Sequence, residues 1–85
     1  MQHELRTLVM YDIENDKVRR YVSEACLDFG LDRIQYSVFC GKLNRNKREE
    51  LLMRLTDILS DFPGKILIQP MCEEDCKGTL ELTRA

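Results

Sequence analysis

The sequence predicts an α+β domain in which two helices cover one face of a β-sheet. Apolar residues recur at helical spacing in two segments, one between Asn15 and Gly30 and one between Asn44 and Pro63. Runs rich in β-branched and aromatic residues stand before, between and after these segments, as strands do. The length of 85 residues suits one domain, and 44% hydrophobic with 33% charged residues is the composition of a globular chain. Two helices packed on one small sheet account for this pattern.

The first strand is predicted over residues 6–12, where the run Thr7–Ile13 favours a buried extended segment. The first helix follows, with Asn15 or Asp16 as its expected N-cap. Gly30 ends this helix, because a residue in the left-handed conformation is common there. The buried face of the helix is expected to carry the apolar residues Val18, Val22, Ala25, Cys26 and Phe29.

Residues 33–40 are β-branched and aromatic, so they form one strand or two short strands joined by a tight turn. The second helix is expected to begin at Asn44 or Asn46, since Asn46 followed by Glu49 resembles a capping box. Pro63-Gly64 ends it. One stripe of this helix is expected to face the core, formed by Leu51, Leu52, Leu55, Ile58, Leu59 and Phe62.

The C-terminal part is predicted to hold a strand over residues 65–71, in which Pro70 places the strand end either at a sheet edge or where the chain leaves the sheet. A polar turn over residues 72–78 then precedes a short alternating strand over residues 79–82. With the middle segment split, the order of elements is that of a ferredoxin-like split βαβ sandwich with a short extra C-terminal strand.

Apolar side chains alternate on both faces of the first strand, with Leu8 and Met10 on one face and Val9 and Tyr11 on the other. Two helices cover only one of these faces. We therefore expect a second copy of the chain to cover the open face, which makes the protein a homodimer. The alternative is that Val9 and Leu67 are tolerated as exposed residues.

The chain is expected to be a single domain over residues 1–85, with a flexible extension over residues 1–5 and a turn and edge strand within residues 72–85. A net charge of −2 gives no overall attraction to nucleic acid or membrane, so a nucleic-acid partner needs a local basic patch. The sequence shows neither an apolar run of about 20 residues nor a signal peptide. We expect a cytoplasmic protein with reduced thiols and no membrane partner.

Asp12 ends the first strand, where the chain leaves the sheet. A side chain at a strand end is held rigidly beside a loop that leaves room for a ligand, so Asp12 is a candidate catalytic residue. The alternative is an Asx turn, in which this carboxylate opens the loop of residues 14–16. The residues alone leave both interpretations open.

A longer pattern surrounds this acid. It consists of Tyr11-Asp12-Ile13, then Arg19, then the run from Gly30 through Phe39, then Gly41 and Leu43. This pattern resembles the small CRISPR-associated endoribonuclease family, whose dimeric members work beside the CRISPR integrase in spacer acquisition. The resemblance covers residues 6–71 and implies a ferredoxin-like fold, a homodimer, and a magnesium site at the twofold axis.

The resemblance also implies roles for individual residues. Asp12 is implied as the catalytic metal ligand. Mg²⁺ often takes one or two protein carboxylates plus phosphate oxygens, and because one Asp per chain is too little, two Asp12 residues would pair across the dimer axis. Arg19, Arg20 and Arg33 are implied to bind nucleic-acid phosphates, for which a guanidinium fork is well suited. Ser37 is implied to form a hydrogen bond near the site. The alternatives are solvated arginines and a simple turn hydroxyl.

Three further groups of residues are candidates for a site. Tyr21 stands where the family often has a basic residue, although Arg20 lies next to it. Cys72 and Cys76 have the spacing of one zinc knuckle, but no second pair accompanies them, so zinc is not expected. The densest basic stretch is either a local nucleic-acid patch or the solvated start of the second helix, and it comprises Lys42, Arg45, Lys47 and Arg48.

Two functions follow from this reading. The first is a magnesium-dependent endonuclease of CRISPR adaptation that cuts single-stranded RNA, double-stranded DNA or both. The second is a scaffold that bridges integrase subunits and binds duplex DNA, with Asp12 catalytically idle and the strand over residues 79–82 pairing across the dimer or with the integrase. An RNA-recognition sheet is disfavoured, because it needs exposed aromatic residues and the chain has few.

Overall fold

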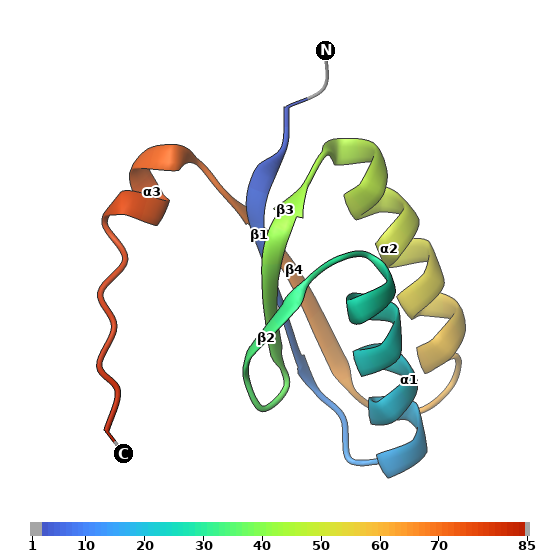
Figure 1. Cartoon of the computed structure of the whole chain (residues 1–85). Helices are drawn as coiled ribbons and strands as arrows, with labels where there is room; N and C mark the ends of the chain where they lie inside the picture. Colours follow the sequence, from blue (N-terminus) through green and yellow to red (C-terminus); the bar gives the residue numbers. More distant parts are fainter. Residues whose placement is uncertain (1–2, 85) are drawn as a thin grey trace.

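The computed structural model describes residues 3–84, and Figure 1 shows the two long helices on one side of a twisted sheet. The first strand, β1, begins at Leu5, so Leu5 belongs to the sheet and not to the extension predicted over residues 1–5. Residues 1 and 2 of that extension lie outside the described part. The elements in chain order are β1 (Leu5–Asp12), α1 (Asp16–Asp28), β2 (Asp32–Gln35), β3 (Val38–Leu43), α2 (Arg45–Leu59), β4 (Lys65–Met71) and α3 (Glu73–Lys77).

The sheet has the strand order β2-β3-β1-β4, and all of its neighbouring strands are antiparallel. This arrangement confirms the predicted α+β class and the ferredoxin-like order, with β1 as an inner strand. Met10 pairs with Val38 of β3 and with Leu67 of β4. Because directly paired residues share one face, these three side chains lie on the same side of the sheet.

The helix ends follow from local chemistry. The Asn15 side chain accepts a hydrogen bond from the Val18 amide at 3.0 Å and so caps α1. Gly30 has a φ of 80°, which confirms its predicted left-handed conformation. Helix α2 is capped by Asn44, whose side chain accepts from the Lys47 amide, and the capping box predicted at Asn46 is therefore wrong.

The middle segment is split into two strands. Its turn places Ser37 at a φ of 67°, and the Ser37 carbonyl accepts a hydrogen bond from the Tyr11 amide at 3.1 Å. This bond ties the turn to the end of β1. Strand β3 continues to Leu43, further than the predicted end at Cys40, and leads directly into α2.

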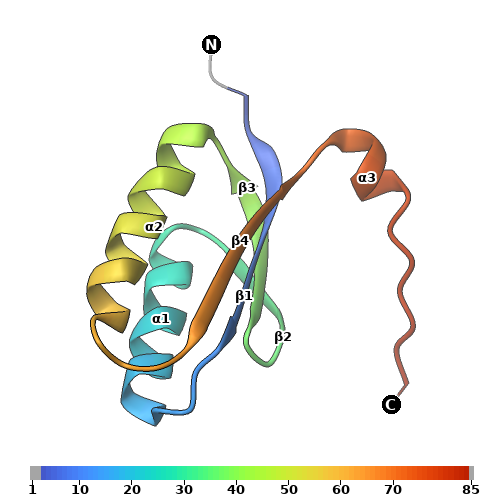
Figure 2. The ribbon, with the colours of Figure 1, turned by 180° about the vertical axis from the view of Figure 1, so that it is seen from behind.

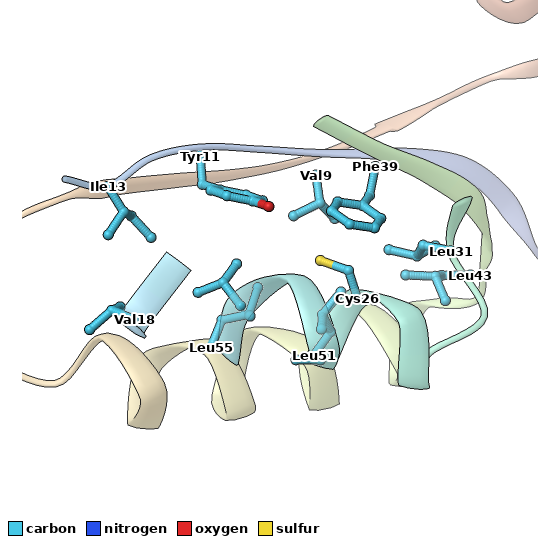
Figure 3. Packing of buried hydrophobic residues seen from close by; sticks show 12 residues of the cluster. Val9, Tyr11, Ile13, Val18, Cys26, Leu31, Phe39, Leu43, Leu51 and Leu55 are labelled. Carbon is cyan, nitrogen blue, oxygen red and sulfur yellow. The ribbon is translucent and has the colours of Figure 1, made fainter. Parts of the chain in front are cut away.

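The core lies between the sheet and helices α1 and α2 (Figure 3). Val9 and Phe39 from the sheet meet Leu51 and Leu55 from α2, and each of these residues is at most 1% exposed. Fully burying such side chains stabilises the fold by about 1.5–3 kcal/mol each. Val9 is thus a core residue, and the alternative that it is tolerated as an exposed residue is wrong, whereas Leu67, the other residue of that alternative, is 43% exposed in the single chain.

Two residues predicted on the buried stripe of α2 are largely exposed: Leu52 at 53% and Phe62 at 47%. Helix α2 ends at Leu59, three residues before Phe62, and Ser60 forms its C-cap. The residues that do point inward are Leu51 and Leu55, with Ile58 and Leu59 packed at the margin of the core.

The C-terminal part differs from the prediction. The expected polar turn contains the short helix α3, and residues 79–84 form neither helix nor strand. The predicted strand over residues 79–82 is therefore absent from the single chain, because no neighbouring strand offers it backbone partners. Figures 1 and 2 show α3 and this tail on the side of the sheet opposite to α1 and α2. Among the described residues, no helix has the length and apolar character that crossing a membrane requires.

Candidate functional site at the end of strand β1

Asp12 is the last residue of β1 and is exposed to solvent. Successive side chains of a strand point to opposite faces, so Asp12 shares the uncovered face with Leu8 and Met10, whereas Tyr11 points toward the helices. Within the described chain, the Asp12 carboxylate accepts no side-chain hydrogen bond and forms no ion pair, and Asn15 caps the helix that follows. The Asx-turn interpretation is therefore not supported, and the carboxylate is available to a ligand.

The loops beside Asp12 form a shallow cavity of about 260 Å³, lined by Asp12, Glu14, Pro63 and Gly64. Gly64 permits the close packing of these loops, since a Cβ atom there would lie 3.0 Å from Ile13 Cγ1 and 3.2 Å from the Asp12 carbonyl oxygen. The turn before β4 thus fixes the backbone on which the candidate ligand stands.

Arg19 holds the loop that follows Asp12. Its Nη1 atom donates to the carbonyl oxygens of Ile13 at 2.9 Å and Glu14 at 3.3 Å, and its Nη2 atom pairs with the Asp16 carboxylate. Its guanidinium also lies 5.6 Å from the centre of the Tyr36 ring. The structure therefore gives Arg19 a role in loop geometry, while its contact with nucleic acid stays a prediction.

The other predicted nucleic-acid residues lie close to Arg19. Arg33 donates from Nη2 to Ser23 Oγ at 2.7 Å and lies 5.1 Å over the Phe39 ring, which is itself fully buried. Arg20 is exposed and lies 5.5 Å over the Tyr21 ring. Ser37 is in the β2–β3 turn, where its backbone rather than its hydroxyl makes the contact with β1.

The predicted residues thus fall on two faces. Arg19, Arg20 and Arg33 line a common cavity between α1 and the β2–β3 turn, together with Tyr11 and Tyr36. Asp12 stands on the opposite face of β1 and does not line this cavity. The sequence analysis did not identify Tyr36, which is 70% exposed, because no spacing rule relates it to its neighbour Arg19.

The basic stretch at the start of α2 is partly neutralised by its own helix. Arg45 pairs with Glu49 and Lys47 pairs with Glu50, both at 3.3 Å, and all four side chains are more than half exposed. Arg48 donates to the Leu43 carbonyl oxygen at 2.9 Å. These contacts favour the solvated helix start over a dedicated nucleic-acid patch.

Within the described part of the chain, two groups have clearly shifted pKa values. A hydrogen bond from Arg6 Nη1 to Cys40 Sγ, at 3.3 Å on the open face, raises the pKa of Arg6. Burial raises the pKa of Cys26 to about 11. Cys26 is fully buried in the core, so this thiol stays protonated and serves packing.

Metal-ligating residues are sparse in one copy of the chain. Within residues 3–84, no group of three or more His, Cys, Asp or Glu side chains is placed to hold a metal ion. Cys72 donates to Asp75 Oδ2 at 3.1 Å instead of joining a zinc knuckle with Cys76. A site for Mg²⁺ at Asp12 therefore needs oxygen ligands from outside a single chain.

These features define a small ferredoxin-like α+β protein with an exposed carboxylate at the end of an inner strand and a cluster of arginines on the opposite face. The sequence profile of the family described as CRISPR associated protein Cas2 matches residues 5–78. The chain belongs to the Cas2 family.

Individual relatives agree with this assignment. The chain is 52% identical over 73 residues to a protein from Desulforudis audaxviator named CRISPR-associated endoribonuclease Cas2, covering 86% of this chain and 69% of that one. It is 40% identical to a protein of Archaeoglobus fulgidus named CRISPR-associated endoribonuclease Cas2 1, over 85% of this chain and 76% of the other. The crystal structure of Streptococcus pyogenes Cas2 at pH 6.5 superposes with a TM-score of 0.78 at 25% identity, covering 93% of this chain and 100% of that one.

Proposed function

We propose that this protein is a magnesium-dependent endonuclease of CRISPR adaptation, and so of antiviral defence, that acts on single-stranded RNA, double-stranded DNA or both. The observation that carries the proposal is the Asp12 carboxylate, which has no side-chain partner within residues 3–84 and lies at the rigid end of β1 on the uncovered sheet face. Membership in the Cas2 family and relatives named as endoribonucleases support phosphodiester hydrolysis. The proposal keeps the cytoplasmic location that the sequence predicts.

The proposal includes a homodimer packed through the open sheet face. Met10, Val38 and Leu67 form an apolar row across this face, and Leu67 is 43% exposed in the single chain. Covering this row with a second copy removes apolar surface from water and brings the Asp12 side of both sheets into one interface. Replacing Leu67 with Glu is expected to shift the protein toward monomer in sedimentation analysis, and an unchanged dimer would contradict this packing.

Two Asp12 carboxylates brought together at the dimer axis would supply hard oxygen ligands of the kind that Mg²⁺ prefers. When bound, Mg²⁺ would polarise the phosphodiester and lower the pKa of a coordinated water. The protein's own contribution is positional. Strand β1 holds the carboxylate, and Arg19 and Gly64 fix the loops on either side of it.

The experiment that tests this function compares Asp12→Asn with Glu14→Gln. Both acids are exposed and line the same cavity, but only Asp12 belongs to the strand. We expect cleavage of labelled RNA or duplex DNA to require Mg²⁺, to be lost in Asp12→Asn at matched dimer content, and to persist in Glu14→Gln. Equal cleavage by wild type and Asp12→Asn would refute the role of Asp12.

The C-terminal tail favours a second candidate function, that of a scaffold between CRISPR integrase subunits on duplex DNA. Leu80 is 96% exposed and Leu82 is 81% exposed, on a segment without regular structure. An extended segment with alternate apolar side chains suits strand addition to a sheet edge of a second copy or of the integrase. Under this function, removing residues 79–85 would weaken assembly with the integrase, whereas Asp12→Asn would leave spacer integration intact.

A further inference from the structure

A second site lies on the helix-covered side of β1, away from Asp12. It is a cavity of about 210 Å³ between α1 and the β2–β3 turn. Sites that engulf a whole small molecule are larger, roughly 300–1,000 Å³. This cavity is therefore too small to enclose a whole small molecule, and it suits a single unit of a longer polymer whose other units stay outside. The cavity is lined by Tyr11, Asp16, Arg19, Arg20, Ser23, Glu24, Arg33 and Tyr36.

Tyr11 forms the inner wall of the cavity. Tyr11 is 7% exposed, and its hydroxyl is buried without a hydrogen-bond partner in the described chain. Figure 3 shows its ring between the sheet and the helices, with the hydroxyl directed along this layer toward the side of Val9 and Phe39. This hydroxyl is inaccessible to solvent and points along the core layer, so Tyr11 closes the cavity with its ring and offers no hydrogen-bonding group to a ligand.

The outer side carries an exposed aromatic ring. Tyr36 stands in the β2–β3 turn and is 70% exposed, with the Arg19 guanidinium 5.6 Å from its ring centre. Because Arg19 is held by loop carbonyls and by Asp16, it gives the ring a fixed neighbour. An aromatic ring that is open to solvent beside cations is a surface on which an unpaired nucleobase stacks.

Two arginines of the cavity retain donors for an anion. Arg33 uses Nη2 for Ser23 Oγ, which leaves other N–H groups of its guanidinium free, and Arg20 is exposed. Three arginines face two carboxylates here, those of Asp16 and Glu24, and Asp16 is already paired with Arg19. The surplus positive charge and the fork geometry of arginine suit a phosphate group.

We propose that this cavity holds one unpaired nucleotide of a nucleic-acid strand, with its base on Tyr36 and its phosphate at Arg20 and Arg33. The inference rests on the proposed nucleic-acid function and deepens it, because it selects strands that carry an unpaired end. The site is separate from Asp12, since consecutive residues of β1 project from opposite faces.

The test uses a DNA duplex with a single unpaired 2-aminopurine nucleotide at one end, and the same duplex with a blunt end. Stacking of 2-aminopurine on a protein ring lowers its fluorescence. We expect the wild-type protein to quench the overhang and to bind it more tightly than the blunt duplex. Losing one stacked base weakens binding about five-fold to a hundred-fold. Tyr36→Leu should therefore remove both the quenching and the preference for the overhang over the blunt duplex. Tyr36→Phe keeps an aromatic ring and should retain both.

Matched variants separate this role from a structural one. Tyr21 is 40% exposed and also lies beneath cations, Lys17 and Arg20, but it does not line the cavity. Tyr21→Leu is therefore expected to keep the quenching.

Equal affinity for overhang and blunt duplex, or quenching that survives Tyr36→Leu, would overturn the inference. Its failure is distinguishable from failure of the proposed nuclease. If the wild-type protein cleaves nucleic acid through Asp12 but does not quench 2-aminopurine, the nucleotide site is refuted and the proposed nuclease is not. Quenching that persists in Asp12→Asn would support the site, whether or not the wild type cleaves.

Discussion

Replacing Arg19 with Met tests whether this arginine is an anchor of the loop after Asp12. The change keeps an unbranched side chain and removes the donors to Ile13 and Glu14. Hydrogen bonds to a charged group contribute about 1.5–3 kcal/mol, and we take about 2 kcal/mol for the two bonds together, because the side chain is 25% exposed. The contact with the exposed Tyr36 ring adds about 0.5 kcal/mol.

The ion pair between Arg19 and Asp16 adds little, since Asp16 is 90% exposed. The expected loss for Arg19→Met is thus about 2–3 kcal/mol in the free energy of unfolding. Urea denaturation at one fixed protein concentration measures it, because association would otherwise shift the midpoint. Arg20→Met is the control, since Arg20 is the next residue of α1 and is exposed; it should change stability by about 0.5 kcal/mol or less. Equal stability of the two variants would refute the anchoring role.

Other predictions concern the packing and the thiols. Gly41→Ala would place a Cβ atom 2.7 Å from Leu31 Cδ2 and 3.2 Å from Leu31 Cα. Thermal denaturation should therefore show a loss of about 1–3 kcal/mol in the free energy of unfolding. Gly78→Ala is the control and should lose much less stability, because within the described chain no atom outside its two neighbours in sequence lies nearer than 3.5 Å to the added Cβ atom. At pH 8, iodoacetamide should modify exposed Cys72 and spare buried Cys26 in the folded protein, as mass spectrometry would reveal; modification of both at one rate would contradict the burial. Burial raises the pKa of Cys26 from 9.0 to about 11, so unfolding at a pH between these two values releases a proton from this thiol. The free energy of unfolding should therefore fall as the pH rises from 9.0 to about 11. Comparison with Cys26→Ala isolates the contribution of the thiol, and identical pH slopes for the two proteins would contradict the prediction.

Signals that act within a few residues were read correctly from the sequence. Asn15 and Gly30 bound α1 as predicted, because each acts through its own backbone or its nearest amides. The choice between Asn44 and Asn46 was different, since both residues are good caps. Strand β3 decided it by continuing to Leu43, so that α2 begins at once.

Features that depend on distant parts of the chain were not predictable in this way. Leu52 matches the apolar period of α2, but the sheet is too narrow to cover it, and it is 53% exposed. Tyr36 meets Arg19 only because the β2–β3 turn returns to the start of α1. The position of Asp12 at an exposed strand end was predicted from the sequence, while its metal-binding role stays a prediction.

The opposite orientations of Tyr11 and Asp12 limit how this protein can change during evolution. Substitutions along β1 alter one side chain at a time and leave both surfaces in place. Inserting or deleting one residue before Tyr11 would turn the hydroxyl toward the open face and the carboxylate into the core. The length of β1 should therefore be held constant among functional variants, even where its apolar residues exchange freely. A library of single-residue insertions, selected for folding, should show depletion inside β1 and tolerance in the tail after Gly78.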